Sequence, residues 1–220
     1  MDVETITCLL SGTGMHATRL GRTCLALLFF TRLGVLAVGA KTLYRNEDED
    51  FVCNSSHRSC TGACFNNYSP ISPFNLFILQ AVVLFTHALA VANYFRHNSQ
   101  AKDNWLQRKF RSRLGQDRQH FVSVLAKAMI EGIFLTTFYK LYDGLQRPSI
   151  VQCATMPCES LVTCTVQKAG EKDVFNLCMN AMSLACLLLC LKELCHTGLK
   201  IRSKTSALEP CFQHQRHGFN

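Results

Sequence analysis

The stretch 53–72, CNSSHRSCTGACFNNYSPIS, holds three cysteines in the spacing C-x6-C-x3-C. A second triplet, Cys153, Cys158 and Cys164, follows later in the chain in the spacing C-x4-C-x5-C. Each triplet lies in a polar segment between two apolar segments. The pattern predicts two membrane hairpins whose cysteine-rich loops lie on the same side and are joined by disulfides.

Four apolar blocks surround these loops. Because about 20 residues of helix cross a hydrocarbon core of about 30 Å, we expect each block to span a membrane. The expected fold is an all-α membrane protein, a bundle of four transmembrane helices. A soluble amphipathic helix is the alternative for the third block, but without that span the two cysteine loops would lie on opposite sides. The blocks are residues 23–43, 74–95, 121–142 and 174–195.

The chain contains 13 cysteines, and their setting decides their expected chemistry. Structural zinc sites favour close C-x2–4-C pairs and a cytosolic setting. Thiols exposed outside the cell oxidise to disulfides instead. We therefore expect bridges in both loops and no metal site. Six cysteines allow fifteen pairings, and the spacing alone does not choose among them.

The distribution of charge predicts which side each segment faces. Segment 96–120 has seven Lys or Arg against two Asp, and the tail 196–220 has four against one Glu. Loop 44–73 has two basic residues against four acidic ones, and loop 143–173 has no net charge apart from Asp143. Basic segments stay on the cytoplasmic side. Both termini and segment 96–120 are therefore expected to be cytoplasmic, and both cysteine loops extracellular.

Polar residues inside the apolar blocks are expected to have partners. Arg32 lies in the middle of the first block, where an unpartnered charge costs at least ~2.5–3.5 kcal/mol. Lys127 and Glu131 lie four residues apart in the third block, on one helix face, and are expected to pair. His87 in the second block is expected to be a hydrogen-bonded packing residue rather than a proton switch.

The cytoplasmic segments contain two further patterns. In segment 1–22, Val3, Ile6 and Leu10 fall on one face of a short amphipathic helix, for which a frayed terminus is the alternative. Segment 96–120 mixes arginines with apolar residues, as in NWLQRKFRSRLG. That mixture fits anionic lipid or a helix-binding regulator, although a solvated loop that sets the topology is the simpler interpretation.

These features together resemble the connexins, the vertebrate gap-junction proteins. Connexin loops have the same two cysteine spacings, followed by phrases similar to SPIS at 69–72 and GEKDVF at 170–175. Their helices contain stretches similar to LFFTRLGVLAVGAK at 28–41, FYKLYDG at 138–144 and ELC at 193–195. The resemblance extends from about residue 2 to about residue 200.

The resemblance implies a gap-junction channel subunit of the plasma membrane. Connexins form homo- or hetero-hexameric pores, or connexons, which dock with those of an adjacent cell in junctional plaques and pass ions and small solutes passively. Two alternatives remain, namely an undocked hemichannel and a nonconducting adhesion or scaffold protein with four spans. The implied disulfides are Cys53–Cys164, Cys60–Cys158 and Cys64–Cys153.

The resemblance also implies roles for single residues. Arg32, Lys127 and Glu131 match a charged network between helices, and segment 1–22 matches a helix at the pore mouth. Calcium modulation is expected to be weak, because Thr42 stands where the family commonly has an acidic residue and Arg45 where it has glycine. The residues that we expect to act in the pore or in gating are Asp2, Lys41, Arg45, Glu47 and Asp50.

The outer loops depart most from the family pattern. His57 to Ser59 replace a Gln-Pro-Gly turn, and Ser160 replaces a residue that is often Asn in docking. Asn54 and Asn67 each begin an N-x-[ST] acceptor for glycosylation. A glycan there would be bulky at the docking face and would favour undocked hemichannels. Alternatively neither acceptor is used, because both lie close to the membrane.

The sequence shows no sign of catalysis. It contains no recognisable nucleophile–base pair, phosphate-binding loop or metal cluster. We therefore expect no enzyme activity, no cofactor and no nucleic-acid partner, and we expect membrane lipid and other subunits to be the contacts of this chain.

Overall fold

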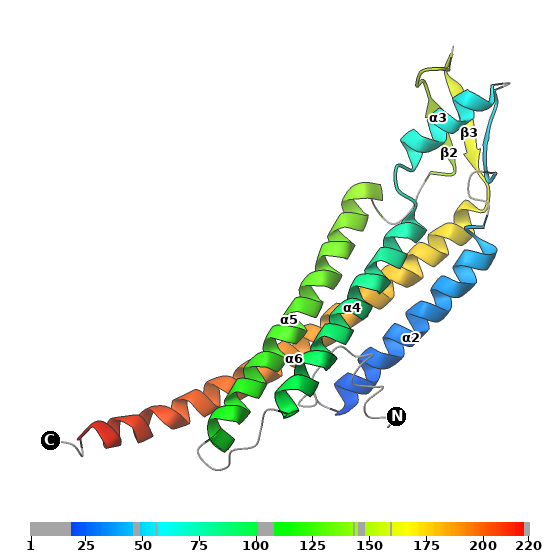
Figure 1. The fold of residues 1–220 in the computed structure, drawn as a ribbon. Coiled ribbons are helices and arrows are strands. Elements are labelled where there is room, and N and C mark those ends of the chain that lie inside the picture. Colours follow the sequence, from blue (N-terminus) through cyan, green and yellow to red (C-terminus); the bar gives the residue numbers. More distant parts are fainter. Residues whose placement is uncertain are drawn as a thin grey trace. The chain divides into compact units, whose positions relative to one another are not determined.

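Four long helices dominate the computed structural model, which describes residues 19–45, 49–55, 57–100, 108–142, 144, 148–158 and 160–217 (Figure 1). Each helix includes a stretch long and apolar enough to cross a membrane, and these stretches are Thr23–Thr42, Pro73–Tyr94, Asp117–Tyr142 and Ala169–Ser206. The helices are α2 (Arg19–Thr42), α4 (Pro73–Gln100), α5 (Arg108–Tyr142) and α6 (Ala169–His217). The mostly helical fold with four candidate spans is the one predicted.

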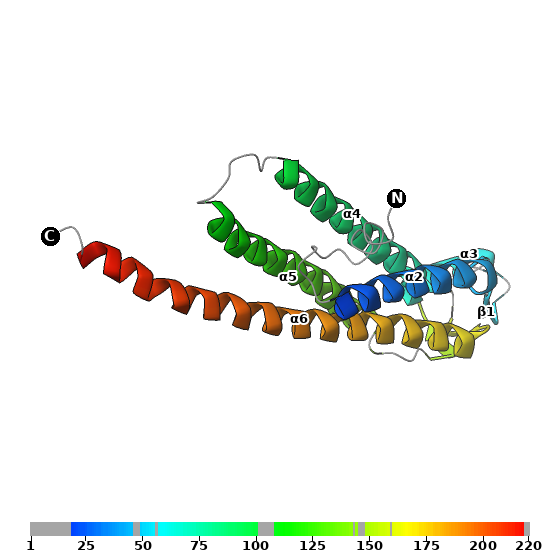
Figure 2. The same cartoon turned by 90° about the horizontal axis from the view of Figure 1, so that it is seen from below.

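The fourth helix is longer than the sequence analysis predicts. We placed a span at 174–195 and a tail after it, because Lys192 and Glu193 end the apolar block. Instead α6 begins at Ala169, with Glu171 in its first turn, where a negative charge is favourable. It then continues past the block as one uninterrupted helix (Figure 2). Polar residues end a membrane-spanning block, but they do not end a helix.

The chain divides into two compact units. Residues 30–82 and 133–184 form the loop-bearing unit, which contains both cysteine loops. Residues 1–29, 83–132 and 185–220 form the terminal unit, which contains both ends of the chain.

The core of the loop-bearing unit is rich in aromatic rings. The Phe77 ring lies 5.3 Å from that of Phe138 and 5.9 Å from that of Phe175, measured between centroids. Gly39 of α2 lets Phe175 approach closely, because a Cβ atom at Gly39 would lie 2.4 Å from Phe175 Cε2. The core of the terminal unit consists of smaller side chains. Its buried members are Leu25, Val124, Ala128, Cys186 and Cys190.

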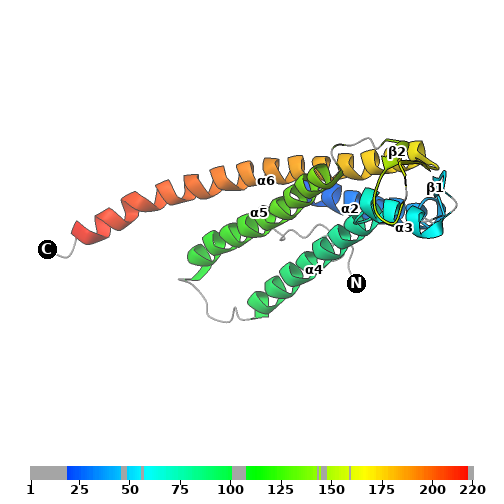
Figure 3. The same cartoon turned by 90° about the horizontal axis from the view of Figure 1, so that it is seen from above.

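The cysteine loops form a small sheet and one short helix. Strands β1 (Phe51–Cys53), β2 (Ile150–Cys153) and β3 (Val162–Val166) make an antiparallel sheet in the order β1-β3-β2. Most of the first loop after β1 is helical, because Arg58–Tyr68 form helix α3 (Figure 3). The second loop alone supplies a strand hairpin.

Candidate functional site

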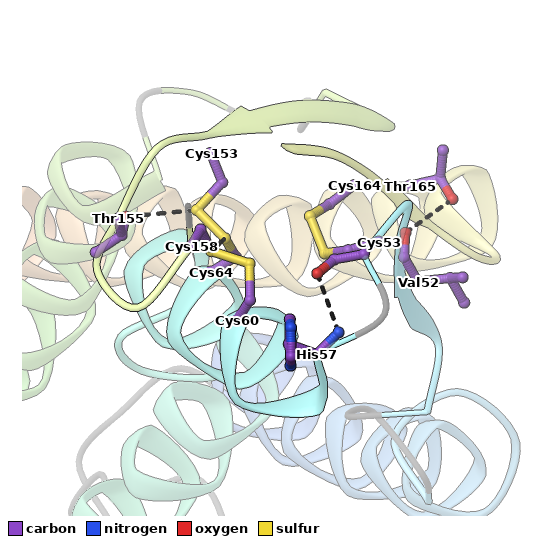
Figure 4. Close-up of a disulfide and its surroundings, with 11 residues drawn as sticks. Val52, Cys53, His57, Cys60, Cys64, Cys153, Thr155, Cys158, Cys164 and Thr165 are labelled. Atoms are coloured by element: carbon purple, nitrogen blue, oxygen red, sulfur yellow. Dashed lines mark hydrogen bonds between the residues drawn. A yellow bond between two sulfur atoms is a disulfide. The ribbon is translucent and has the colours of Figure 1, made fainter. Parts of the chain in front are cut away.

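Three disulfides join the two loops (Figure 4). Cys53–Cys164 links β1 to β3, where the two cysteines are direct partners in the antiparallel register. Cys60–Cys158 and Cys64–Cys153 link α3 to the second loop, with Cα–Cα distances of 5.0 and 5.9 Å. These are the three pairs that the family resemblance implies.

Helix α3 presents one face to the bridges. Cys60 and Cys64 lie one turn apart on that face, and they are 1% and 2% exposed. The sulfur atoms of Cys60, Cys64 and Cys158 gather within 4.8 Å of one another. All three belong to disulfides, so they offer no thiolate to a metal ion.

Aromatic packing supports the bridged loops. Phe51 of β1 is 3% exposed, and its ring centroid lies 5.6 Å from those of both Phe65 and Tyr68 on α3. The Tyr68 hydroxyl donates a hydrogen bond to the carbonyl oxygen of Pro148 in the second loop, at 3.3 Å. The bridges therefore close around a small apolar core rather than holding two bare strands.

Asp50 connects the first loop to the start of α6. Its carboxylate lies 3.0 Å from Lys172 Nζ and 3.7 Å from Lys168 Nζ, and its side chain is 12% exposed. The Lys172 ammonium also lies 5.8 Å from the centroid of the Tyr44 ring, within reach of a cation–π contact. Both partners of this carboxylate lie in the second loop or α6, and the sequence analysis did not pair them with it.

The other expected pore residues have different positions. Lys41 lies in the last turn of α2 and Arg45 shortly after it, and both side chains are exposed. Thr42 donates a hydrogen bond to the carbonyl oxygen of Val38 in the preceding turn, at 2.9 Å. Asp2 and Glu47 lie outside the described residues, and so does most of the expected N-terminal helix.

Arg32 has the partner that its position demands. It is 3% exposed, and its Nη2 donates a hydrogen bond to Ser183 Oγ at 2.9 Å. Gln80 Nε2 donates to the same oxygen at 3.1 Å. Arg32 thus contacts neutral Ser183 on α6, which also accepts a hydrogen bond from neutral Gln80 on α4. Sequence patterns do not identify Ser183 and Gln80, because several neutral residues in these apolar blocks are able to contact an arginine.

Lys127 and Glu131 are both buried in α5, at 4% and 0% exposure. They belong to the terminal unit, whereas Arg32 belongs to the loop-bearing unit. The charged network among the three residues remains a prediction.

Two further polar contacts join α5 to α6 in the terminal unit. His120 Nε2 lies 3.3 Å from Glu193 Oε1, and both side chains are buried. The Asp117 carboxylate lies 3.2 Å from Lys200 Nζ and 2.5 Å from Lys204 Nζ. The sequence did not predict these contacts, because the expected spans begin at residue 121 and end at residue 195, whereas Asp117, Lys200 and Lys204 lie outside them. The spacing of Lys200 and Lys204, one helical turn apart, was the available signal.

His87 is half-buried in α4. Its Nδ1 atom is buried without a hydrogen-bond partner in the part of the chain that the structure describes. Its expected role as a packing residue rather than a proton switch remains a prediction.

A model of the connexin family matches residues 2–120 and 97–199 of the chain. The two overlapping matches together include all four candidate spans up to residue 199 and both bridged loops.

Proposed function

The chain belongs to the connexin family, whose members form hexameric gap-junction channels in the plasma membrane, and we propose that this chain forms docked, intercellular ones. In this proposal six copies surround a pore, alone or mixed with related chains. The hexamer meets one on an adjacent cell through loops 44–73 and 143–173. Ions and small solutes then pass passively between the two cytoplasms.

The bridged loops carry this proposal. Three disulfides and the aromatic contacts of Phe51 hold the sheet and α3 in one arrangement before any partner arrives. A surface that is already ordered loses less conformational entropy on binding. The face of α3 away from its cysteines is exposed, and it is available for such binding.

The proposed orientation places both bridged loops outside the cell and both termini inside. Disulfides form and persist in oxidising compartments, which supports the outer position of the loops. The basic character of segment 96–120 and of the tail supports the inner position of both.

Ion preference is proposed to depend on charges near the outer end of α2. Lys41 and Arg45 are exposed there, and sixfold repetition would turn each into a ring of positive charge. Asp2 and Glu47 remain proposed pore residues on the resemblance alone. Asp50 is proposed to act mainly in support of the loop, because its carboxylate contacts Lys172. Calcium modulation is proposed to be weak, because Thr42 and Arg45 stand where the family commonly has an acidic residue and a glycine.

An undocked hemichannel is the second candidate. Asn54 and Asn67 are both exposed, and Asn67 lies in the last turn of α3. A glycan at either position would be bulky beside the proposed docking surface and would obstruct a facing hexamer. Glycosidase treatment of the surface protein tests this candidate, since a change in electrophoretic mobility that Asn67→Gln removes would support it. Unchanged mobility of the wild type would leave no role for a glycan.

Paired cells that lack other connexins provide the decisive experiment. Dye transfer and junctional conductance between two expressing cells support docked channels. Conductance in single cells without transfer between pairs supports the hemichannel. Surface protein with neither activity would contradict both and favour a nonconducting four-span scaffold.

A further inference from the structure

A cavity of about 500 Å³ lies between α4 and α5 in the terminal unit. Its volume is in the range of known ligand pockets. Most of its lining is apolar, and it opens to the surface of the unit rather than being enclosed. Polar side chains line one end, and the remaining wall consists mainly of small aliphatic residues. Tyr94, Arg118 and Gln119 line the polar end, and Val91, Val122 and Ala126 line the apolar part.

The two ends of this groove differ in chemistry. Gln119 Nε2 donates a hydrogen bond to Tyr94 Oη at 2.8 Å, which joins α5 to α4 at the polar end. From Arg118 to Ala126 the axis of α5 advances about 12 Å, at 1.5 Å per residue. The groove therefore extends about 12 Å along α5, with its polar end at Arg118 and a mainly apolar part from Val122 to Ala126, and His87 lines its far part.

The position of the groove along the spans indicates what surrounds it. Its lining residues belong to the candidate spans Pro73–Tyr94 and Asp117–Tyr142. The polar end coincides with the ends of both spans, next to the basic segment 96–120. The apolar part lies at hydrocarbon depth if these helices cross the bilayer, where the surrounding molecules are lipids.

We propose that this groove binds one acyl chain of an anionic phospholipid, with the phosphate at Arg118. The exposed guanidinium of Arg118 suits a phosphate, which accepts its paired hydrogen bonds. Tyr94 and Gln119 offer further polar contact at the headgroup end, and Val91, Val122 and Ala126 contact the chain. With the proposed orientation, the lipid comes from the cytoplasmic leaflet, where anionic lipids are concentrated.

A phospholipid bound there has a structural consequence. It fills the space between α4 and α5 at the level of His87, whose Nδ1 has no hydrogen-bond partner among the residues that the structure describes. Lipid occupancy would then set how closely the two helices approach each other beyond the Tyr94–Gln119 contact.

Photolabelling tests the proposal on the full-length hexamer. The purified protein is reconstituted into phosphatidylcholine vesicles that contain a trace of phosphatidylserine or phosphatidylcholine with a photoreactive group on one acyl chain. Labelled peptides are then located by mass spectrometry. We expect labelling of residues 87–94 and 118–126, with a preference for phosphatidylserine of about fivefold, as one basic contact provides.

Three variants separate the parts of the site. Ala126→Phe fills the groove and should reduce labelling of these peptides to background. Arg118→Gln should remove the preference for phosphatidylserine but keep labelling by both lipids. Met129→Phe is the matched control, because Met129 is 57% exposed on the same helix but does not line the groove. It should label as the wild type does.

The outcomes that contradict the proposal are equally specific. Unchanged labelling of Ala126→Phe, or equal labelling by the two lipids in the wild type, would overturn it. Absence of label from both peptides would indicate that protein covers the groove, from the N-terminal segment or from a second copy. Size-exclusion chromatography shows whether each variant remains a hexamer, and none of these results depends on whether two hexamers dock.

Discussion

The bridged loops and the terminal unit are held together by different chemistry. In the loops, three disulfides join strands of three to five residues and an 11-residue helix. In the terminal unit, long helices contact one another through side chains such as Asp117 with Lys200, and His120 with Glu193. Long apolar helices satisfy their own backbone hydrogen bonds in a membrane, whereas short elements in water bury too little surface to be stable alone.

The difference concerns what each region needs in order to fold. A disulfide restricts the unfolded loops, and it acts whether or not the surroundings are apolar. A buried ion pair adds less net stability, because desolvating both charges offsets much of their attraction. Loss of such an ion pair reduces stability mainly when one charged partner stays buried without the other. The two regions should therefore respond to different substitutions and reagents.

Removing a bridge should have the largest effect. The double variant Cys60→Ser with Cys158→Ser removes one disulfide without leaving a free thiol to mispair, and it should destabilise the loops by about 2–4 kcal/mol. We expect dye transfer between paired cells to be lost. Cys178→Ser is the control, because Cys178 is a free, exposed cysteine of α6. Normal coupling in the double variant would contradict a requirement for this bridge.

Breaking the Asp117 contact should affect the terminal unit and leave the bridges intact. Asp117→Asn removes the charge that holds Lys200 and Lys204, and hydrogen bonds to charged groups contribute about 1.5–3 kcal/mol in total. The effect should lie near the lower value, because both lysines are partly exposed and solvent screens them. Thermal unfolding in detergent should shift downward while the protein migrates unchanged on a nonreducing gel. A changed pattern of disulfides would show that the two regions are not independent.

A methyl group at Gly39 should disturb the aromatic core beneath the loops. Gly39→Ala places a Cβ against the Phe175 ring, and overpacking of this kind costs about 1–3 kcal/mol. The ring is able to move, so we expect about 1 kcal/mol. Gly34→Ala on the same helix is the matched control, because no atom of the residues described by the structure lies within 4 Å of its added Cβ. Equal melting temperatures for the two variants would contradict the close approach.

Ser183→Ala should have the smallest effect. It removes the oxygen that accepts from both Arg32 and Gln80. Both donors have further interactions, so we expect a cost of about 1 kcal/mol rather than the ~1.5–3 kcal/mol of a lost hydrogen bond to a charged group. Ser183→Thr keeps a hydroxyl and serves as the comparison. Thermal unfolding of the two variants should differ by a small amount, with the alanine variant less stable. A more stable alanine variant would mean that Ser183 is not an important partner of Arg32.

The sequence predicts the bridged loops and the four spans, because cysteines, charges and apolar blocks identify these parts by residue type alone. Cysteines in polar loops and basic segments between apolar blocks are such signals, and the helices and bridges follow them. Helix α3 was missed because glycine and asparagine within it disfavour a helix, as at Gly62 and Asn66, while its bridges favour one. The spacing of Cys60 and Cys64, one turn apart, was consistent with a helix but too short to predict it.

The partners of buried charges were harder to predict, for a physical reason. Any of several neutral residues in an apolar block is able to contact Arg32, and only packing selects Ser183 and Gln80. The Asp117 contact depends on α6 continuing beyond its apolar part, which composition did not reveal. The groove between α4 and α5 depends on how two helices approach, and single-helix patterns do not contain that information.

The two faces of α3 have a consequence for how such chains diversify. The cysteine face determines that the loop folds, and it tolerates little change. The opposite face, with Arg58, Gly62 and Asn66, is exposed and takes no part in the bridges. Mutations there are able to accumulate without cost to folding. Under the proposed docking, gene copies that share one loop architecture would differ in the partners that they recognise through this face.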